Sequence, residues 1–269
     1  MQNRAMIFGI LVASACYAQT QTDTPVQFDV VSVKMHNPEN QGGGIQLLPN
    51  GIHLVNLPLQ DFIREAYGLT LNDQIVGTPS WANSERFDVE AKVDSADVAA
   101  FRKLTLDQIR QMGRPILTNR FKLASHEETK VLPVYALIVG KGETKLKLST
   151  MSSEDANART GVIEMRHPSN PNGSMNELIA RGITMDQLAK ALSKQDLGRV
   201  VLDNTGLTGK YDFTLSWAPA NVAADPNSAN TSGPSIFTVV TERLGLKLES
   251  QKGAVPVLVI DHIEMPSPN

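Results

Sequence analysis

Two stretches of this chain alternate strictly between polar and apolar residues, which is the pattern of a strand with one buried face. The first covers residues 86–93 and the second covers residues 210–217, 124 positions later. The apolar positions are Phe87, Val89, Ala91 and Val93 in the first stretch, and Tyr211, Phe213, Leu215 and Trp217 in the second. We expect both sets to face a core.

Two other stretches repeat apolar residues at i, i+3, i+4 and i+7, which predicts amphipathic helices. Their apolar positions are Leu59, Phe62, Ile63 and Ala66, and Met185, Leu188, Ala189 and Leu192. The surrounding windows, 56–64 and 182–190, lie 126 positions apart. Thr184 and Gln187 have the spacing of a capping box, and Pro58 suits a first helical turn. Gly68 and Gly198 stand where C-terminal caps are expected.

A third pair of segments aligns without a gap, Thr118–Leu137 onto Thr241–Ile260, at a separation of 123. Identical residues recur at Thr118/Thr241, Arg120/Arg243, Leu123/Leu246, Pro133/Pro256 and Val134/Val257. Each segment predicts the end of a helix, a strand, a short turn and a buried strand. The final runs, 134–139 and 257–260, are apolar on both faces, as is typical of central strands.

Hairpins are predicted before each of the two amphipathic helices. Residues 45–48 and 52–55 flank Pro49-Asn50-Gly51, a strong turn signal. Residues 162–165 and 175–179 flank a longer loop that contains Asn172-Gly173.

These matches predict an α+β protein made of two tandem repeats, each a hairpin, a helix, two strands, a helix and two strands. We expect antiparallel sheets with helices on one face. The first repeat spans 19–150 and the second spans 151–269. Convergence of two common amphipathic patterns is the alternative to duplication. The pattern leaves open whether the halves share one sheet or pack as a pseudo-two-fold pair. Residues 149–160 and 218–233 are expected to be loops.

The N-terminus predicts an exported protein. Residues 1–18 have the features of a signal peptide: Arg4, a short apolar run over 5–15, and small residues at Cys16 and Ala18 before the cut. The apolar run is shorter than a membrane span, although a signal-anchor is the alternative. Acylation of Cys16 would instead give a lipoprotein, but the usual preceding leucine is missing. Cys16 is the only cysteine, so cleavage would leave no disulfide or thiol nucleophile.

Charge and composition argue against several classes of partner. The formal net charge is −3, and basic residues are scattered, which argues against nucleic acid or anionic lipid. No later segment is long and apolar enough to span a membrane, and no motif indicates a cofactor. Gly42-Gly43-Gly44 precedes a strand and lacks a following Lys-Ser/Thr, so it is not a phosphate loop. We expect an envelope or extracellular partner, and the oligomeric state stays open.

Several short motifs together resemble an uncharacterised family of exported proteins that is abundant in soil bacteria, Acidobacteria above all. They are Ala66-Tyr67-Gly68, Gly77-Thr78-Pro79-Ser80-Trp81, Arg86-Phe87-Asp88-Val89, Asn119-Arg120-Phe121-Lys122-Leu123 and the segment 203–213. In some members a similar domain follows a sensor metallopeptidase of the beta-lactam-receptor kind, which implies a sensing or binding role. The family has no established activity. Gly113 and Pro115 depart from its pattern, and we expect a helix break near Pro115.

Candidate catalytic groups are sparse. Asp203-Asn204-Thr205-Gly206 is similar to an aspartic protease loop, but Asn204 replaces the catalytic Asp, and a tight turn is the better interpretation. His262 and Glu264 share a strand face and would form a general-base pair or half a metal site. His126 lies among acids, yet no second histidine has metal-ligand spacing, so exposed strand histidines are the simpler interpretation. No serine hydrolase elbow occurs.

The candidate partner-binding residues are Trp81, Asp88, Glu90, His126, Asp212, Thr214 and His262. Trp81 is expected in a loop stiffened by Pro79, either as a contact anchor or folded back over the core. The site is expected either in a groove between the two repeats or on the polar sheet face around Asp88, Glu90, Asp212 and Thr214. The sequence therefore favours a non-enzymatic exported binding protein. A hydrolase of envelope or extracellular polymer, using acids with His126 or His262, and a purely structural protein are the alternatives.

Overall fold

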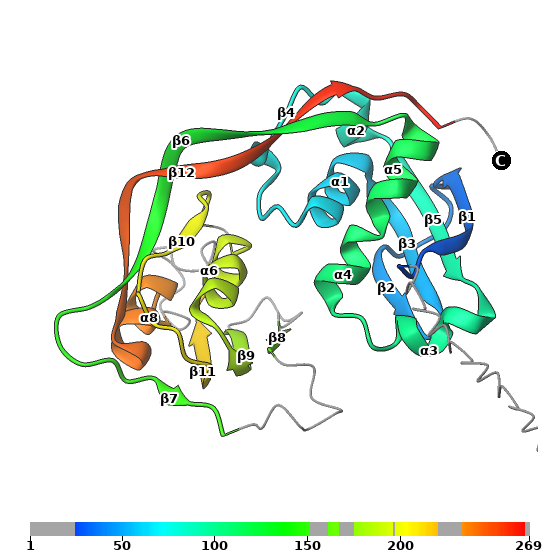
Figure 1. Cartoon of the computed structure of the whole chain (residues 1–269). Coiled ribbons are helices and arrows are strands. Elements are labelled where there is room, and N and C mark those ends of the chain that lie inside the picture. Colours follow the sequence, from blue (N-terminus) through cyan, green and yellow to red (C-terminus); the bar gives the residue numbers. More distant parts are fainter. Residues whose placement is uncertain (1–24, 151–160, 167–174, 196, 220–232, 267–269) are drawn as a thin grey trace, which may run out of the picture.

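The computed structural model describes residues 25–150, 161–166, 175–195, 197–219 and 233–266. It is a mixed α+β structure with three four-stranded sheets and several helices, which confirms the predicted class. Figure 1 shows two bodies of helices and strands, bridged by two long strands that lie side by side. We call them the first and second modules. None of the helices in the described part of the chain combines the length and apolar character needed to cross a membrane.

The first module contains an antiparallel sheet of strand order β1-β5-β3-β2. Its strands are β1 (Phe28–Met35), β2 (Gly44–Leu48), β3 (Gly51–Pro58) and β5 (Arg86–Val93). The helices are α1 (Leu59–Tyr67), α2 (Trp81–Ser84), α3 (Val98–Phe101), α4 (Leu106–Gln111) and α5 (Gly113–Phe121), with 3-10 turns η1 (Asn72–Gln74) and η2 (Ser95–Asp97). The alternating face of β5 is buried as expected.

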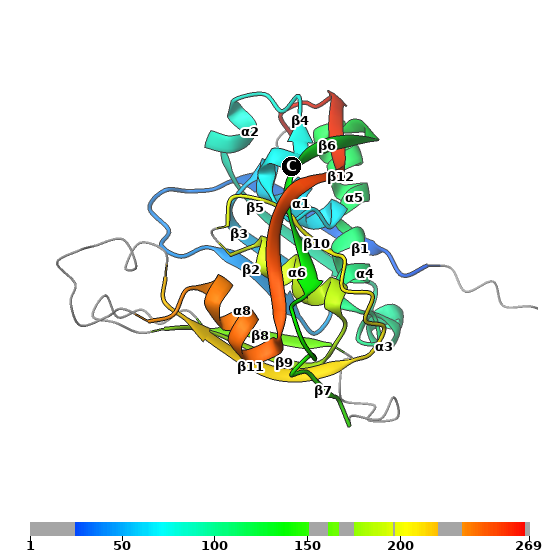
Figure 2. The ribbon, with the colours of Figure 1, turned by 90° about the vertical axis from the view of Figure 1, so that its left-hand side faces the viewer.

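The second module contains a second antiparallel sheet, of order β7-β11-β9-β8. Its elements are β7 (Lys147–Leu148), β8 (Val162–Arg166), β9 (Asn176–Ile183), β11 (Tyr211–Trp217), α6 (Met185–Ser193) and α8 (Ile236–Leu244). Figure 2 shows α6 and α8 on the same side of this sheet. The hairpin expected between 162–165 and 175–179 is present as β8 and β9, while Asn172-Gly173 lies outside the described residues.

The two halves of the chain share the third sheet, of order β10-β6-β12-β4, which answers the question that the sequence left open. Its strands are β4 (Ile75–Val76), β6 (Ala124–Val139), β10 (Val201–Asp203) and β12 (Leu246–His262). β6 and β12 pair antiparallel from Val139↔Leu246 to Ser125↔Ile260. The short strands run parallel, β10 to β6 and β4 to β12, so the expectation of wholly antiparallel sheets is wrong here.

The turn predicted within each of the matched segments 118–137 and 241–260 does not exist, because β6 and β12 are each one continuous strand. The proline of each segment lies within the ladder, Pro133 opposite Lys252 and Pro256 opposite Thr129. We call the paired strands β6 and β12 the ribbon. In its middle only these two strands are present, so each of them has one open edge. A proline is tolerated in a strand where its missing N–H would face such an open edge. The expected central strands are correct, since Val134, Leu137, Val257 and Leu258 are buried.

Each module has its own apolar core, and each core receives residues from the other half of the chain. The first core is built from residues between Val33 and Leu123, together with Leu258 and Ile260 from the end of β12. The second is built from residues between Leu178 and Leu248, together with Leu137 from the end of β6. The long strands therefore cross over, so that each module is completed by the strand end of the opposite half.

The helix predictions hold at their apolar positions. α1 buries Leu59, Phe62, Ile63 and Ala66, and Gly68 caps it in the left-handed region. α6 buries Met185, Leu188, Ala189 and Leu192, and the Thr184–Gln187 capping box is formed. Gly198 is not its cap, because α6 ends at Ser193 with Lys194 as the capping residue.

The predicted break near Pro115 is present. α4 ends at Gln111 and α5 restarts at Gly113, which places Pro115 in the first turn of a new helix, where its missing N–H costs little. A Cβ on Gly113 would lie 2.9 Å from the ring of Phe62, so the glycine allows α5 to approach α1 closely.

The crossing strands predict that a cut between the two halves of the chain will not separate the two pieces. If a protease site is placed within residues 151–160 and cleaved, the two pieces should still elute as one particle in size-exclusion chromatography, because β6 and β12 remain paired and buried in opposite cores. The same sample in concentrated guanidinium chloride should separate into two pieces. Separate elution under native conditions would contradict the exchange of strands.

Candidate functional site

The residues that the sequence nominated are spread over the molecule rather than gathered at one place. Trp81 is the first residue of the one-turn helix α2, where an irregular loop was expected, and it packs half-buried against the first core. Glu90 lies exposed on β5, and its carboxylate is 2.6 Å from Lys92 Nζ, a hydrogen bond that lowers the pKa of Glu90. Thr214 is exposed on β11 in the second module.

Asp88 holds a β-bulge in the first sheet. The register of β3 against β5 slips between Leu54 and Leu57, so that Val55 and Asn56 together oppose Asp88. Asn56 takes a left-handed backbone with φ 53°, and its N–H donates to Asp88 Oδ1 at 2.9 Å. The same oxygen contacts Nδ1 of the nearly buried His36 side chain at 2.8 Å. The carboxylate is therefore engaged within the fold.

Asp212 holds a bulge of the same form in the second sheet. Arg181 and Gly182 oppose it, because the register of β9 against β11 slips between Tyr211 and Phe213. Gly182 has φ 61°, and its N–H donates to Asp212 Oδ1 at 2.6 Å. The alternating pattern correctly placed Asp88 and Asp212 in strands. Their hydrogen-bond donors could not be predicted, because they depend on a slip in the register of the neighbouring strand, and this slip has no clear sequence signal.

His126 joins the two long strands near one end of the ribbon. Its Nδ1 lies 2.9 Å from Asp261 Oδ2 on β12, and its Nε2 lies 3.4 Å from Glu128 Oε1. The hydrogen bond to Asp261, followed by that to Glu128, raises the pKa of His126 by stabilising the imidazolium. The side chain is 51% exposed on the open surface of the ribbon. The arrangement is a surface ion pair across two strands.

His262 and Glu264 do share a face, as predicted, with 2.8 Å between Nε2 and Oε1. Both side chains are 57% exposed. In the described parts of the chain, no group of three or more His, Cys, Asp or Glu residues is arranged to hold a metal ion. The Asp203 segment forms the predicted turn, since Asp203 Oδ1 accepts from the backbone N–H of Thr205 at 2.9 Å and from its hydroxyl at 2.7 Å.

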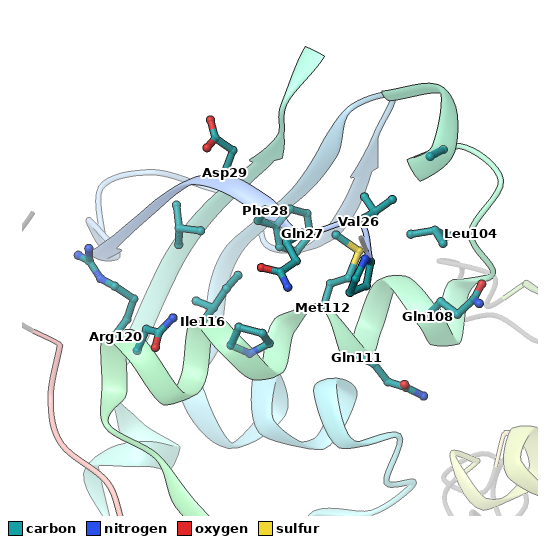
Figure 3. A pocket seen from close by; sticks show the side chains of 15 residues that line it. Val26, Gln27, Phe28, Asp29, Leu104, Gln108, Gln111, Met112, Ile116 and Arg120 are labelled. Atoms are coloured by element: carbon teal, nitrogen blue, oxygen red, sulfur yellow. The ribbon is translucent and has the colours of Figure 1, made fainter. Parts of the chain in front are cut away.

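A groove of about 810 Å³ opens in the first module between the start of β1 and helices α3, α4 and α5 (Figure 3). Its size is in the range of small-molecule and peptide sites. Fifteen described residues line it: Pro25, Val26, Gln27, Phe28, Asp29, Val31, Ala100, Leu104, Gln108, Gln111, Met112, Pro115, Ile116, Asn119 and Arg120. None of the nominated residues is among them.

The groove has an apolar floor and an uncharged polar margin. Phe28 at the start of β1 and Val26 in the segment before it lie opposite Met112 and Ile116 from the helices, while the Gln27 side chain extends from the same segment toward α5 (Figure 3). Ile116 is buried and the other floor residues are half-buried, which fixes their positions. Asp29 turns its carboxylate away from the helices in Figure 3, and Arg120 stands at the same end on α5.

Sequence reasoning missed this groove for an identifiable reason. Its walls come from segments about 80 residues apart in the chain, and neither wall carries a motif. The one available signal was the break at Gly113 and Pro115, because it splits the helical segment into α4 and α5, which both line the groove.

The two bulge aspartates give a stability prediction. Asp88→Ala and Asp212→Ala should each lower the free energy of unfolding by about 1–3 kcal/mol, because each leaves a bulge N–H without its acceptor. Asp→Asn at either site should cost less, since an amide oxygen still accepts. Asp29→Ala, an exposed carboxylate on the same strand system, is the control and should stay within about 0.5 kcal/mol. Urea unfolding measures all of them, and equal values for Asp88→Ala and Asp29→Ala would contradict the role of the bulge.

Comparison with known proteins adds a family but no activity. No curated protein and no solved structure matches the chain. A family model described as a protein of unknown function, DUF3738, matches residues 60–263, and thus begins within α1 and ends just after β12. Because the match spans most of the chain, the protein belongs to the DUF3738 family.

Proposed function

We propose that the protein is an extracytoplasmic binding protein whose ligand occupies the groove between β1 and α3–α5. The groove itself carries this proposal: it combines an apolar floor with uncharged polar side chains and a single arginine, which is the usual composition of a ligand site. Its floor residues belong to the first core, so the site is preformed rather than assembled on binding.

The lining residues support binding more than hydrolysis. Glycosidase chemistry needs two carboxyl groups facing each other across a cleft. Among the described lining residues Asp29 is the only acid, and its carboxylate points away from the helices (Figure 3). The two histidines of the hydrolase alternative, His126 and His262, stand on the ribbon and its end, and neither lines the groove.

We also propose that the two halves derive from one duplicated unit. The order hairpin, helix, short strand, strand, helix, long strand recurs from β2 to β6 and from β8 to β12. Asp88 and Asp212 support bulges of the same form in the two sheets. In the ribbon, Val131 pairs with Ala254, and these two residues are counterparts in the ungapped alignment. This is the pairing that a pseudo-two-fold axis through the middle of the ribbon would produce.

Within the described residues, the groove is then a feature of the first half. α3 and α4 contribute Ala100, Leu104, Gln108 and Gln111 to it, and the described part of the second half has no helix between β11 and α8. Divergence of one copy to hold a ligand, while the other keeps the common framework, is consistent with a binding function.

Export predicts a shortened mature chain. Expressed with its own N-terminus in a Gram-negative host, the protein should be recovered outside the cytoplasm beginning at Gln19, because the cut is expected after Ala18. Ala18→Arg should leave the full-length form, since a small residue is required at that position. N-terminal sequencing reads the result, and an uncut chain in the cytoplasm would contradict export.

The groove predicts binding of a small apolar anion. Anilinonaphthalene sulfonate should gain fluorescence with the wild-type protein, because the floor is apolar and Arg120 supplies one positive charge. Gln27→Trp and Ala100→Trp, which fill the groove from opposite walls, should weaken binding at least about tenfold, or about 1.4 kcal/mol.

Gln46→Trp is the matched control for this experiment. Gln46 is exposed on β2, the opposite edge strand of the same sheet, and it does not line the groove. It should bind the dye as the wild type does. Equal loss in all three variants, or no loss in any, would contradict a ligand site in the groove.

A further inference from the structure

We propose that the protonation of His126 controls how firmly the first module holds the C-terminal end of β12. The residues concerned are 258–264, which we call the tail. Its inner side chains, Leu258 and Ile260, complete the first core. The inference concerns the ribbon and does not depend on the groove or on its ligand.

The tail has few attachments beyond Ile260. The register of β12 against β6 slips between Ile260 and His262, so Asp261 is an extra residue that the ladder leaves unpaired. One further pair, at His262, ends the ladder. After it, the backbone N–H of Glu264 donates to the carbonyl oxygen of Phe121 at the end of α5, at 2.7 Å. Segments with few hydrogen bonds open most readily, so one side-chain contact is enough to change the opening of the tail.

His126 supplies a contact that spans the two strands at this point. It lies on β6, and its Nδ1 is 2.9 Å from Oδ2 of Asp261, the residue that the bulge leaves unpaired. Its Nε2 is 3.4 Å from Oε1 of Glu128, two residues further along β6. Both ring nitrogens therefore face a carboxylate. The contact with Asp261 joins the tail to the opposite strand, and the contact with Glu128 orients the ring.

This geometry is fully satisfied by one protonation state of the ring. An imidazolium carries a proton on each nitrogen, so it donates to both carboxylates. A neutral imidazole has one N–H, so it donates to one carboxylate and turns a lone pair toward the other. Deprotonation of His126 therefore removes a positive charge and one of the two hydrogen bonds from the junction between β6 and the tail.

The two hydrogen bonds also set the direction of the pH dependence. The bond to Asp261, followed by the bond to Glu128, raises the pKa of His126 above the usual value of 6.5. Because the pKa is raised in the folded protein, the contact stabilises the tail fully below about pH 6.5, and this contribution is lost as the pH rises through the raised pKa. We expect a firmer tail in mildly acidic solution than in alkaline solution.

The other groups around His126 do not cancel this effect. Lys130 Nζ lies 3.6 Å from Oε2 of Glu128, so it offsets part of the charge of Glu128 and leaves that of Asp261. The strand β4, which pairs with β12 beside the tail, is apolar. Tyr67 of α1 bonds to the residue before His126, which points to the other face of the ribbon.

The exposure of the pair sets the size of the effect. The side chain of His126 is 51% exposed and that of Asp261 is 49% exposed. Exposed ion pairs shift an equilibrium by about fivefold at most, and salt screens them. The protonation of His126 therefore adjusts the opening of the tail and does not decide whether the first module folds.

The test is hydrogen exchange of the mature chain, read by mass spectrometry at about pH 5.5 and about pH 8.5, on either side of the usual histidine pKa. Rates are converted to protection factors, which removes the pH dependence of the exchange chemistry. The ratio of protection at low and high pH is taken for residues 258–264 and divided by the ratio for residues 246–249. These reference residues lie at the other end of β12, in the second module, so a change in global stability cancels. The wild type should give a value of about two to five.

Three variants provide the matched comparisons. His126→Gln should have a ratio of about one, with the tail at the low protection that the wild type shows at high pH. His126→Arg keeps its positive charge at both pH values, so its ratio should also be about one, but at the high protection of the acidic wild type. His262→Gln is the control and should keep the wild-type ratio, because the carboxylate partner of His262, Glu264 at 2.8 Å, belongs to the tail itself.

A wild-type ratio of one, or an equal ratio in the wild type and His126→Gln, would overturn the inference. Sodium chloride at about 1 M should bring the wild-type ratio close to one, because it screens exposed pairs. A ratio that salt leaves unchanged would show that the ion pair is not its cause and would also overturn the inference. None of the substituted residues lines the groove, so dye binding tests the proposed function independently.

Discussion

The antiparallel pairing of β6 with β12 is the interaction on which the rest of this structure depends. The ladder runs without a turn from Val139↔Leu246 to Ser125↔Ile260, and its two ends lie in different modules. At one end Leu258 and Ile260 complete the first core, where β4 pairs beside them; at the other end Leu137 completes the second core, where β10 pairs beside it. In between, Val131 is 69% exposed, so main-chain hydrogen bonds rather than burial hold the middle of the ribbon. Each module therefore needs residues from both halves of the chain to complete its core.

Local patterns in the sequence predicted the parts of the fold that local chemistry controls. The stripe of α1 and α6, the capping box at Thr184 and the buried face of β5 were all visible, because they require only spacing and residue type. The turn expected in each of the segments 118–137 and 241–260 was wrong because the local pattern does not distinguish two strands joined by a turn from one continuous strand. Which applies is decided by the partner strand, and β12 is more than 100 residues from β6. The bulges at Asp88 and Asp212 escaped prediction for the same reason, since a slip of register belongs to a pair of strands.

The candidate site shows even more clearly that local sequence predicts local features, whereas contacts between distant segments escape prediction. The nominated aspartates are bonded to backbone amides within the sheets, and the nominated histidines form exposed hydrogen bonds with carboxylates. The groove instead uses residues with no individual chemical signature, such as Val26, Gln27 and Met112, whose importance comes only from the meeting of β1 with α4 and α5. A candidate site of this kind is specified by tertiary structure. Sequence could indicate its position only through the helix break that sets α4 apart from α5.

The crossing of the long strands has a consequence for how this chain can be made. A polypeptide synthesised or threaded from its N-terminus ordinarily folds its first domain before the second appears. Here the first core lacks Leu258 and Ile260, and β4 lacks its pairing strand, until nearly the last residue has emerged. The first module can therefore complete its core only after the C-terminal end of β12 is available. A truncation near the C-terminus that removes the end of β12 would therefore damage the first module, although the missing residues belong to the other half of the chain.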